Sequence, residues 1–222
     1  MQGEIYIEND ADKWFERNIS IKHNCFTEYL IQLFPKKHLK NMNLAEFGVG
    51  RANNVSLLSH FTNLIDGYDG SKKSIEMIDI LKKRASNIDG KRVNLCDSFD
   101  GLNEYDLIIY GFFTYMINAQ EFSHLVENSK SLLKDKGYIF IYDFLATENK
   151  ESIDSHNSDL KVFKRNLDFY ISEFKDFQLV DFRLFDNRNL KEYLDYDNIS
   201  NIDNSLDSDD YHWTFSALFK RR

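Results

Sequence analysis

The sequence predicts an α/β fold built on a doubly wound, mostly parallel sheet, and three observations predict it. Short apolar runs alternate with stretches of helical periodicity through the first two thirds of the chain. The run at 44–47 ends in Gly48 and Gly50, as at a tight turn from a first strand into a helix. Two long strand-like runs lie near 177–184 and 211–219. The alternation favours parallel pairing of the early strands, and we expect the two late runs to pair antiparallel at one edge.

The elements follow in order along the chain. Residues 10–34 carry apolar side chains largely at helical spacing and stop at Pro35, so we expect an N-terminal helical lid within 1–40. The Asp- and Asn-rich stretch 187–210 has a weak apolar pattern, which predicts a long surface excursion. Seven strands are expected, near 44–47, 63–68, 93–96, 105–110, 137–142, 177–184 and 211–219, with helices near 53–61, 72–86 and 119–134.

Composition and charge bound the organisation and the partners. The chain has 222 residues, of which 42% are hydrophobic, enough for the core of one α/β domain and too few for two. Its net charge of −8 and its pI near 5.3 argue against a nucleic acid as partner, because binding phosphates normally needs a basic face. Cys25 and Cys96 lie far apart in the sequence and indicate neither a disulfide framework nor a metal site.

Targeting signals are not evident in the sequence. The first residues are too acidic and too poor in apolar side chains for a signal peptide. No apolar run approaches the length of about 18 residues that a membrane span needs. We therefore expect a cytoplasmic protein without a membrane partner.

A glycine pair followed by an acidic residue predicts a nucleoside site. Gly48 and Gly50 follow the first expected strand, where a sharp turn brings the backbone close to a ligand. Asp69 ends the second expected strand, in the position where a ribose would lie, and the two oxygens of a carboxylate match two hydroxyl donors. A plain tight turn at the glycines and a helix N-cap at Asp69 are the alternatives.

The residues around these glycines favour a cationic ligand. No glycine follows Gly50 where a dinucleotide fingerprint would bring its third one, because residues 52–54 are Ala, Asn and Asn, so a pyrophosphate is not strongly indicated. Glu46 lies just ahead of the first glycine, where its charge would repel a phosphate but would suit an amino group or a sulfonium. The pattern therefore points to S-adenosylmethionine rather than to NAD.

Residues 40–144 resemble the class I S-adenosylmethionine-dependent methyltransferases, with 46–50, Asp69, Asp97, the strand of Asp106 and 132–138 in the order of that family. The resemblance implies a Rossmann-like fold with a seven-stranded, mostly parallel sheet and an antiparallel C-terminal edge. It implies Glu46 near the methionine end, Asp69 on the ribose and Asp97 beside the adenine. The expected cofactor set is Glu46, Gly48, Gly50, Asp69, Gly70, Asp97, Ser98, Tyr110 and Phe112, with Trp14 and Arg17 closing over it from the lid.

One methyltransferase domain over 1–222 is therefore expected. It divides into the helical lid at 1–40, the cofactor-binding core at 41–145, and an acceptor-side loop with the closing strands at 146–222.

A narrower resemblance lies at both ends of the chain. Segments 14–18, 162–166 and 209–215 are similar to segments of the pseudaminic acid biosynthesis-associated methylase family and related surface-polysaccharide methyltransferases. This resemblance implies a small-molecule acceptor, a sugar or a nucleotide sugar in surface-glycan biosynthesis. Lys161, Lys164 and Arg165 are candidates to clamp a carboxylate or phosphate of that acceptor, with a solvated helical face as the alternative.

Methyl transfer needs alignment and, for many acceptors, a base. The sulfonium already activates the methyl group, so orientation supplies much of the acceleration and no metal is expected. An acceptor that carries a proton has to lose it. Asp143, which follows an expected strand at the ligand-binding edge, and His156, on an expected loop, are the catalytic candidates, with His212 as a weaker third. Phe112, Phe113, Tyr115 and Met116 are an aromatic wall or ordinary core.

Two other functions stay open at this point. A non-catalytic interaction protein would keep the fold and the cofactor cleft without turnover. A protein or tRNA methyltransferase would use Lys164, Arg165 and the basic residues at 220–222 as a docking surface, against the acidic total charge. The oligomeric state also stays open, with a homodimer among the possibilities.

Overall fold

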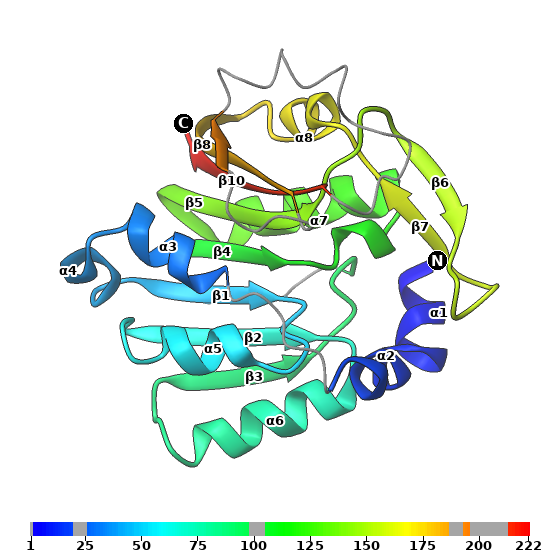
Figure 1. Ribbon diagram of the computed structural model, residues 1–222. Helices are drawn as coiled ribbons and strands as arrows, with labels where there is room; N and C mark the ends of the chain where they lie inside the picture. Colours follow the sequence, from blue (N-terminus) through cyan, green and yellow to red (C-terminus); the bar gives the residue numbers. More distant parts are fainter. Residues whose placement is uncertain (1, 20–25, 98–104, 187–192, 196–212) are drawn as a thin grey trace.

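The computed structural model describes residues 2–19, 26–97, 105–186, 193–195 and 213–222 (Figure 1). An eight-stranded sheet runs through the centre of the molecule in the order β3-β2-β1-β4-β5-β10-β8-β9. Its strands are β1 (Asn43–Phe47), β2 (Leu64–Asp69), β3 (Ile88–Arg92), β4 (Tyr105–Gly111), β5 (Leu133–Phe144), β8 (Phe177–Asp186), β9 (Tyr193–Asp195) and β10 (Trp213–Arg221).

Strand pairing confirms the predicted topology. The four pairs among β3, β2, β1, β4 and β5 are all parallel. Strand β10 lies between β5 and β8 and is antiparallel to both. These seven strands are the seven-stranded sheet expected from the sequence, and the three-residue strand β9 adds an eighth at the edge beside β8. Reversal of the strand order at β1 and β4 opens a crevice beyond the carboxyl ends of these strands.

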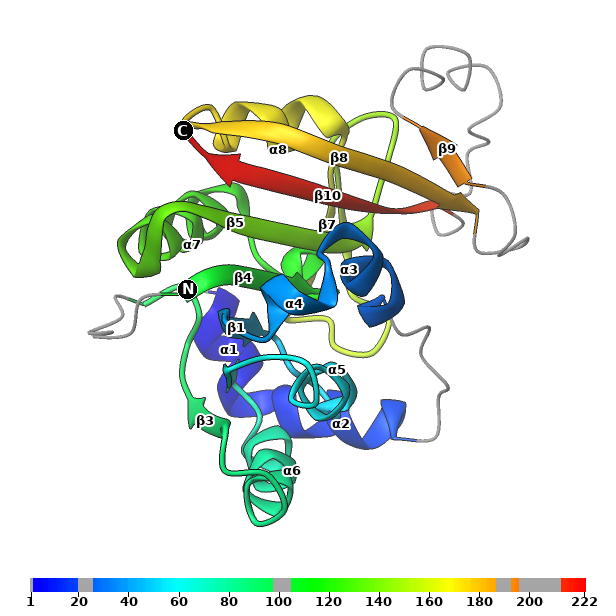
Figure 2. The same ribbon diagram turned by 90° about the vertical axis from the view of Figure 1, so that its left-hand side faces the viewer.

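Helices cover both faces of the sheet (Figure 2). On one face, α3, α4 and α5 bury apolar side chains such as Leu30, Leu39 and Val55. On the other face, α7 and α8 bury Phe122 and Tyr170. The helices are α1 (Gln2–Asn9), α2 (Ala11–Asn18), α3 (Thr27–Leu33), α4 (Lys36–Leu39), α5 (Asn53–Leu58), α6 (Lys72–Lys82), α7 (Ala119–Leu132) and α8 (Leu167–Glu173), and a short 3₁₀ turn, η1 (Thr114–Met116), precedes α7.

Local sequence signals explain where these helices begin. At the start of α7, the Asn118 side chain accepts a hydrogen bond from the Glu121 backbone, and the Glu121 carboxylate accepts one from Asn118 in return. This capping box satisfies two backbone donors that the first turn of a helix leaves free. At the start of α6, Ser71 is the N-cap and accepts from the Ser74 backbone. The N-cap alternative for Asp69 is therefore wrong.

The third strand was predicted in the wrong place. The sequence predicts it at 93–96, whereas β3 is Ile88–Arg92 and pairs with β2. Only Ile88 is buried in this edge strand, so its residues lack the apolar pattern of a central strand. The apolar residues Val93, Leu95 and Cys96 have another role, because they line the cleft described below.

The two ends of the chain also differ from the predicted elements. The helical spacing in the sequence begins at residue 10, whereas α1 begins at Gln2. Three helices, α1, α2 and α3, lie in the described part of 1–34. Strands β6 (Lys150–Ile153) and β7 (Lys161–Lys164) form a separate hairpin after β5. The expected surface excursion at 187–210 lies outside the described residues apart from β9. Among the helices described, none is long and apolar enough to cross a membrane.

Candidate functional site

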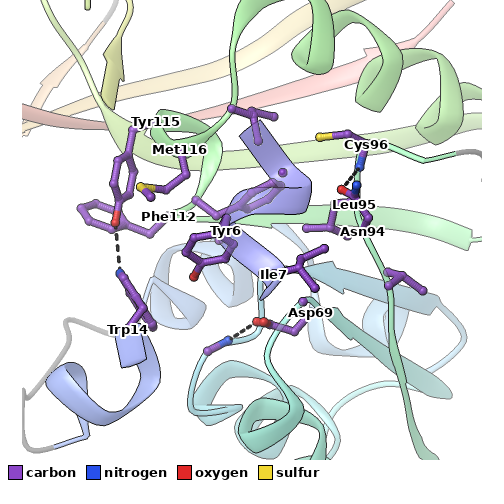
Figure 3. A pocket seen from close by; sticks show the side chains of 18 residues that line it. Tyr6, Ile7, Trp14, Asp69, Asn94, Leu95, Cys96, Phe112, Tyr115 and Met116 are labelled. Carbon is purple, nitrogen blue, oxygen red and sulfur yellow. Dashed lines mark hydrogen bonds between the residues drawn. The ribbon is translucent and has the colours of Figure 1, made fainter. Parts of the chain in front are cut away.

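A cleft lies at the carboxyl ends of β1, β2 and β4, beneath α1 and α2 (Figure 3). The cavity within the cleft has a volume of about 60 Å³. Figure 3 places Asp69, Asn94 and Cys96 on one side and Trp14 and Tyr115 on the other. The lining residues are Gly3, Tyr6, Ile7, Trp14, Gly48, Gly50, Asp69, Gly70, Val93, Asn94, Leu95, Cys96, Gly111, Phe112, Phe113, Tyr115, Met116 and Ile117.

The glycine turn after β1 needs its glycines. Gly48 and Gly50 have φ angles of +74° and +50°, a region that side chains other than glycine rarely adopt. A Cβ on Gly48 would lie 2.7 Å from Phe113 Cδ1, and one on Gly50 would lie 3.3 Å from Trp14 Cζ3. The turn therefore combines an unusual backbone conformation with close packing against the cleft wall.

Strain is also present on the other side of the cleft. Phe112, the first residue after β4, has a φ of +58° although it carries a bulky side chain. A non-glycine residue in this conformation costs on the order of 1–3 kcal/mol and persists only where the surroundings enforce it. Its ring packs tilted against Phe144, with ring centroids 4.6 Å apart, and lines the cleft. The turns after the neighbouring strands β1 and β4 thus both contain residues in uncommon backbone conformations.

Asp69 joins the turn after β1 to the turn after β2. Its Oδ2 accepts a hydrogen bond of 2.9 Å from the Gly50 backbone N–H, and its Oδ1 accepts one of 2.8 Å from the Ser71 backbone N–H. The side chain is buried, and burial raises the pKa of its carboxyl to about 6 although both backbone bonds oppose the change. Each oxygen keeps acceptor capacity toward the cleft, which suits a pair of neighbouring hydroxyl donors.

Glu46 is a buried carboxyl with an incomplete set of partners. Asn54 donates a hydrogen bond of 2.9 Å to Oε1, and within the described part of the chain Oε2 has no hydrogen-bond partner. Burial raises the pKa of this carboxyl to about 8. A Cβ on Gly111, a cleft residue, would lie only 3.0 Å from Oε1. The arrangement can accept a donor, above all a cation, at the floor of the cleft.

Asn54 supports Glu46, a role that the sequence does not indicate. In the sequence it marks only the absence of a third glycine. In the structure its amide nitrogen holds Glu46, while its Oδ1 accepts a hydrogen bond of 2.7 Å from Thr27 Oγ1. The sequence carried no signal for this role, because the three residues come from three separate elements.

The N-terminal helices supply one wall of the cleft. Ile7 packs against Gly70 so closely that a Cβ there would lie 2.6 Å from Ile7 Cγ1. Trp14 Nε1 donates to Tyr115 Oη at 3.3 Å. Tyr6 lies between these contacts in Figure 3, and burial raises the pKa of its phenol well above the usual value. Tyr6 and Ile7 were missed, although Gly3, Tyr6, Ile7, Asp10 and Trp14 recur at helical spacing and are the available signal.

Some of the residues predicted to bind the cofactor line the cleft, and others do not. Glu46 lies directly behind the lining, and Ser98 lies outside the described residues. The lining includes Trp14, Gly48, Gly50, Asp69, Gly70 and Phe112.

Three expected cofactor residues have other surroundings. Tyr110 is buried beneath α7, where its hydroxyl pairs with Ser129 Oγ. Arg17 forms a forked pair with Asp10 at 2.8 and 3.2 Å. Asp97 is exposed, and its Oδ1 accepts a hydrogen bond from Asn94. None of the three is part of the lining, so their contact with a cofactor stays a prediction.

The catalytic candidates are not gathered at the cleft either. Asp143 is fully buried and hydrogen-bonded to Thr114 and Phe144. His156 is exposed in the connection between β6 and β7, and His212 lies outside the described residues. Cys96 lines the cleft, but burial raises the pKa of its thiol to about 12, which makes a thiolate rare at neutral pH.

The three basic candidates also have distinct surroundings. The Arg165 guanidinium is buried and donates to backbone carbonyls. Lys164 is buried, whereas Lys161 is exposed and pairs with Glu151 on the neighbouring strand. Within the described chain, no lysine or arginine side chain lines the cleft.

Solved structures with the same fold define the class of this protein. The N-methyltransferase NodS from Bradyrhizobium japonicum WM9, in complex with S-adenosyl-L-homocysteine, superposes with a TM-score of 0.62 over 95% of this chain and 97% of its own, at 12% identity. Coclaurine N-methyltransferase bound to N-methylheliamine and S-adenosylhomocysteine gives a TM-score of 0.64 over 88% and 72%, at 10% identity. The fold is that of the S-adenosylmethionine-dependent methyltransferases, as the sequence predicted.

A more specific match gives the family. The family model described as tellurite resistance protein TehB matches residues 33–183, and the chain belongs to this family. TehB from Haemophilus influenzae superposes with a TM-score of 0.64 over 95% of this chain and 67% of its own, at 12% identity. The search of curated protein sequences gives no match. By fold and family the protein is therefore an S-adenosylmethionine-dependent methyltransferase.

Proposed function

We propose that the protein transfers the methyl group of S-adenosylmethionine to a small-molecule acceptor of low charge, with a sugar as the favoured class. The buried carboxyl of Glu46 is the main observation that supports the proposed cofactor. Its carboxyl is buried with one oxygen unpartnered among the described residues, directly behind the lining of a cleft whose wall carries the Asp69 carboxylate. A donor with a cationic amino group and a ribose diol matches both groups.

These residues fit the methyl donor. Asp69 would accept the ribose hydroxyls, and Glu46 would face the ammonium of the methionine end. Gly48, Gly50 and Gly70 would let the backbone approach the donor, since a Cβ at each position would meet a neighbouring side chain. When bound, S-adenosylmethionine supplies a sulfonium-activated methyl group. The protein then has to align the acceptor with it and exclude water.

The far end of the cleft supports an acceptor of low charge. Trp14, Phe112 and Tyr115 line it with aromatic rings, against which the apolar face of a sugar ring can stack. Trp14 Nε1 and Tyr115 Oη are polar groups at the same end. A nucleotide sugar would bring phosphates, and the described lining offers them no cationic side chain. These observations support a sugar without phosphate groups over a nucleotide sugar.

The base for such an acceptor is a separate part of the proposal. Asp143 and His156 both lie outside the cleft lining, and Asp143 is hydrogen-bonded on both oxygens, whereas His156 is exposed. We therefore take His156 as the candidate to test first. Replacing His156 with Gln should lower kcat, and an unchanged kcat would exclude His156 as the base.

Two measurements test the proposed function. Calorimetry should detect binding of S-adenosylhomocysteine to the purified protein, and absence of binding by both this product and S-adenosylmethionine would overturn the proposal. A panel of sugars, amino sugars and nucleotide sugars should then be screened by release of S-adenosylhomocysteine. Turnover with a neutral sugar is the expected outcome, and turnover with nucleotide sugars alone would contradict the argument from charge.

The alternatives predict other results. A non-catalytic interaction protein would bind S-adenosylhomocysteine but turn over no acceptor, and the close contact of Ile7 with Gly70 over the cleft is the observation in its favour. A tRNA or protein methyltransferase would need a basic docking face, but Lys164 and Arg165 are buried. A cytoplasmic location, the division into lid, core and acceptor-side parts, and a role in surface-glycan biosynthesis remain predictions from the sequence.

A further inference from the structure

We infer that Asp143 and Arg165 are positioning residues that hold the η1 turn in place as the acceptor-side wall of the cleft. The inference rests on the proposed function, because it assigns the acceptor to the aromatic end. Neither side chain touches the cleft. Both act through the backbone and side chain of Thr114, the first residue of the turn.

Asp143 holds the beginning of the turn. Its Oδ2 accepts a hydrogen bond of 2.7 Å from the Thr114 backbone N–H and one of 2.6 Å from Thr114 Oγ1. Its Oδ1 accepts a third, of 2.7 Å, from the Phe144 backbone N–H. A fully buried carboxylate with three donors is a fixed anchor, and β5 fixes its position in the sheet.

Arg165 holds the carbonyl side of the same turn. One guanidinium nitrogen donates to the Thr114 carbonyl at 2.7 Å, and the other donates to the Ile117 carbonyl. The rings of Phe122, Phe163 and Phe169 surround the guanidinium, with its central carbon 4.7 to 5.6 Å from their centroids. A planar fork reaches two carbonyls at once, which the single ammonium of a lysine does not do.

The residues of this turn face the cleft. Tyr115, Met116 and Ile117 all belong to the lining, and Tyr115 Oη accepts the hydrogen bond from Trp14. The Met116 carbonyl accepts a bond of 2.6 Å from Gln2 Nε2, so α1 docks on the same turn. The anchors at Thr114 and Ile117 therefore determine where the aromatic end of the cleft lies, whereas at the other end Asp69 bonds to Gly50 and Asn94 to Asp97.

Three variants test this inference without an identified acceptor. Thr114→Val removes the hydroxyl bond to Asp143 at nearly constant volume, Thr114→Ser keeps it, and Arg165→Lys keeps the charge but loses the fork. Hydrogen exchange of the amides at 113–118 should rise about tenfold in Thr114→Val and Arg165→Lys and stay near wild type in Thr114→Ser. The affinity for S-adenosylhomocysteine should stay within about twofold in all three.

A second readout uses Trp14. In a Trp213→Phe background Trp14 is the only tryptophan, and its emission reports the contact with Tyr115. Thr114→Val should shift this emission to the red and increase quenching by acrylamide, and Thr114→Ser should restore it. Unchanged exchange in both Thr114→Val and Arg165→Lys, or equal damage in Thr114→Ser, would overturn the inference. Loss of S-adenosylhomocysteine binding by the wild type would instead overturn the proposed function, since exchange is measured without ligand.

If Arg165→Lys does not fold, as judged by circular dichroism, the pair Thr114→Val and Thr114→Ser decides alone. Once an acceptor is known, Thr114→Val should raise its KM and leave the KM for S-adenosylmethionine unchanged. A parallel rise in both values would contradict a role confined to the acceptor wall.

Discussion

Asp69 and Glu46 are buried carboxyls at the same edge of the sheet, and their surroundings give them different roles. Asp69 accepts hydrogen bonds from two backbone N–H groups, so part of the cost of burying its charge is offset within the protein. Glu46 has one amide donor and one oxygen without a partner in the described chain, and its pKa is raised to about 8. Asp69 can accept hydrogen bonds from a ligand as a carboxylate that is already ionised, whereas Glu46 ionises when a cationic group binds beside it.

The first prediction concerns Asp69. Asp69→Asn should weaken binding of S-adenosylhomocysteine by about 10- to 100-fold, because the amide loses one charge-assisted acceptor and turns its NH₂ group toward a backbone N–H. Asp89→Asn is the matched control, since Asp89 is an exposed β3 carboxylate paired with Lys82. Calorimetry measures both variants. Equal affinity of Asp69→Asn and the wild type would exclude Asp69 as the ribose ligand.

The second prediction concerns proton release at Glu46. At pH 7 a group with a pKa of about 8 is mostly protonated, and an ammonium placed beside it favours the ionised form. Binding of S-adenosylmethionine at pH 7 should therefore release close to one proton, seen as a dependence of the binding enthalpy on the ionisation enthalpy of the buffer. The isosteric variant Glu46→Gln should bind without this dependence. The same proton release in Glu46→Gln would place its source at another group.

The sequence predicted the residues of the site whose role depends on local geometry. Gly48 and Gly50 follow the end of one strand and Asp69 ends the next, and all three line the cleft. The places of Asn54 and Tyr6 at the site could not be predicted from the sequence, because they depend on contacts between elements that are distant in the sequence. Asp143 is a catalytic candidate in the sequence, whereas its hydrogen bond with Thr114 cannot be predicted there, because the two residues belong to separate elements.

At the scale of elements, the contact of α1 with the loop after β2 governs the cleft. Ile7 occupies the space that a side chain on Gly70 would need, and Arg92 Nε donates to the Gly70 carbonyl at 2.8 Å. On α2, Asp12 accepts hydrogen bonds from Ser71 Oγ and from the Lys73 backbone. The start of α6 therefore fixes both N-terminal helices over the cleft.

The third prediction tests this contact. Gly70→Ala should displace α1, because its Cβ would lie 2.6 Å from Ile7 Cγ1, and residues 2–18 should then become more sensitive to limited proteolysis. The double variant Gly70→Ala with Ile7→Ala should restore resistance by giving back the space. If the double variant is cut as readily as the single one, the effect does not come from this contact.

Elements with a strong period were predictable, and elements at edges were not. The central strands β1, β4 and β5 and helix α7 match the expected positions closely, because each has a continuous buried run or a capping signal. Strand β3 has a single buried residue, Ile88, and α1 has few buried side chains, so neither presents a clear period. Packing against neighbouring elements, rather than local sequence, determines both.

At the scale of the whole molecule, buried carboxyls set how stability depends on pH. Burial raises the pKa of Glu46 to about 8 and those of Asp69 and Asp143 to about 6. An acid with a raised pKa in the folded state holds its proton where the unfolded chain has lost it. Its contribution to stability is therefore complete below the unfolded pKa and is lost as the pH rises through the folded pKa.

The fourth prediction follows from the separation of these values. Between pH 6 and pH 8 Glu46 dominates the titration of the three, because Asp69 and Asp143 are already about half ionised at pH 6, and Glu46 alone should lower the free energy of unfolding by about 2 kcal/mol over this interval. Glu46→Gln should remove most of the decline, whereas Asp143→Asn should leave the slope above pH 7 nearly unchanged. Urea unfolding at several pH values gives the slopes. A wild-type stability that rises from pH 6 to pH 8 would contradict the protonated state assigned to Glu46.

The place of β10 in the sheet has a consequence for how the molecule is made. Strand β10 is synthesised after β5 and β8 and lies between them, pairing with both. Until residues 213–221 have left the ribosome, the two older strands expose backbone donors and acceptors along facing edges, which invite pairing with other chains. A ribosome-bound nascent chain can thus form the parallel half of the sheet early, but it stays open to aggregation until this strand arrives.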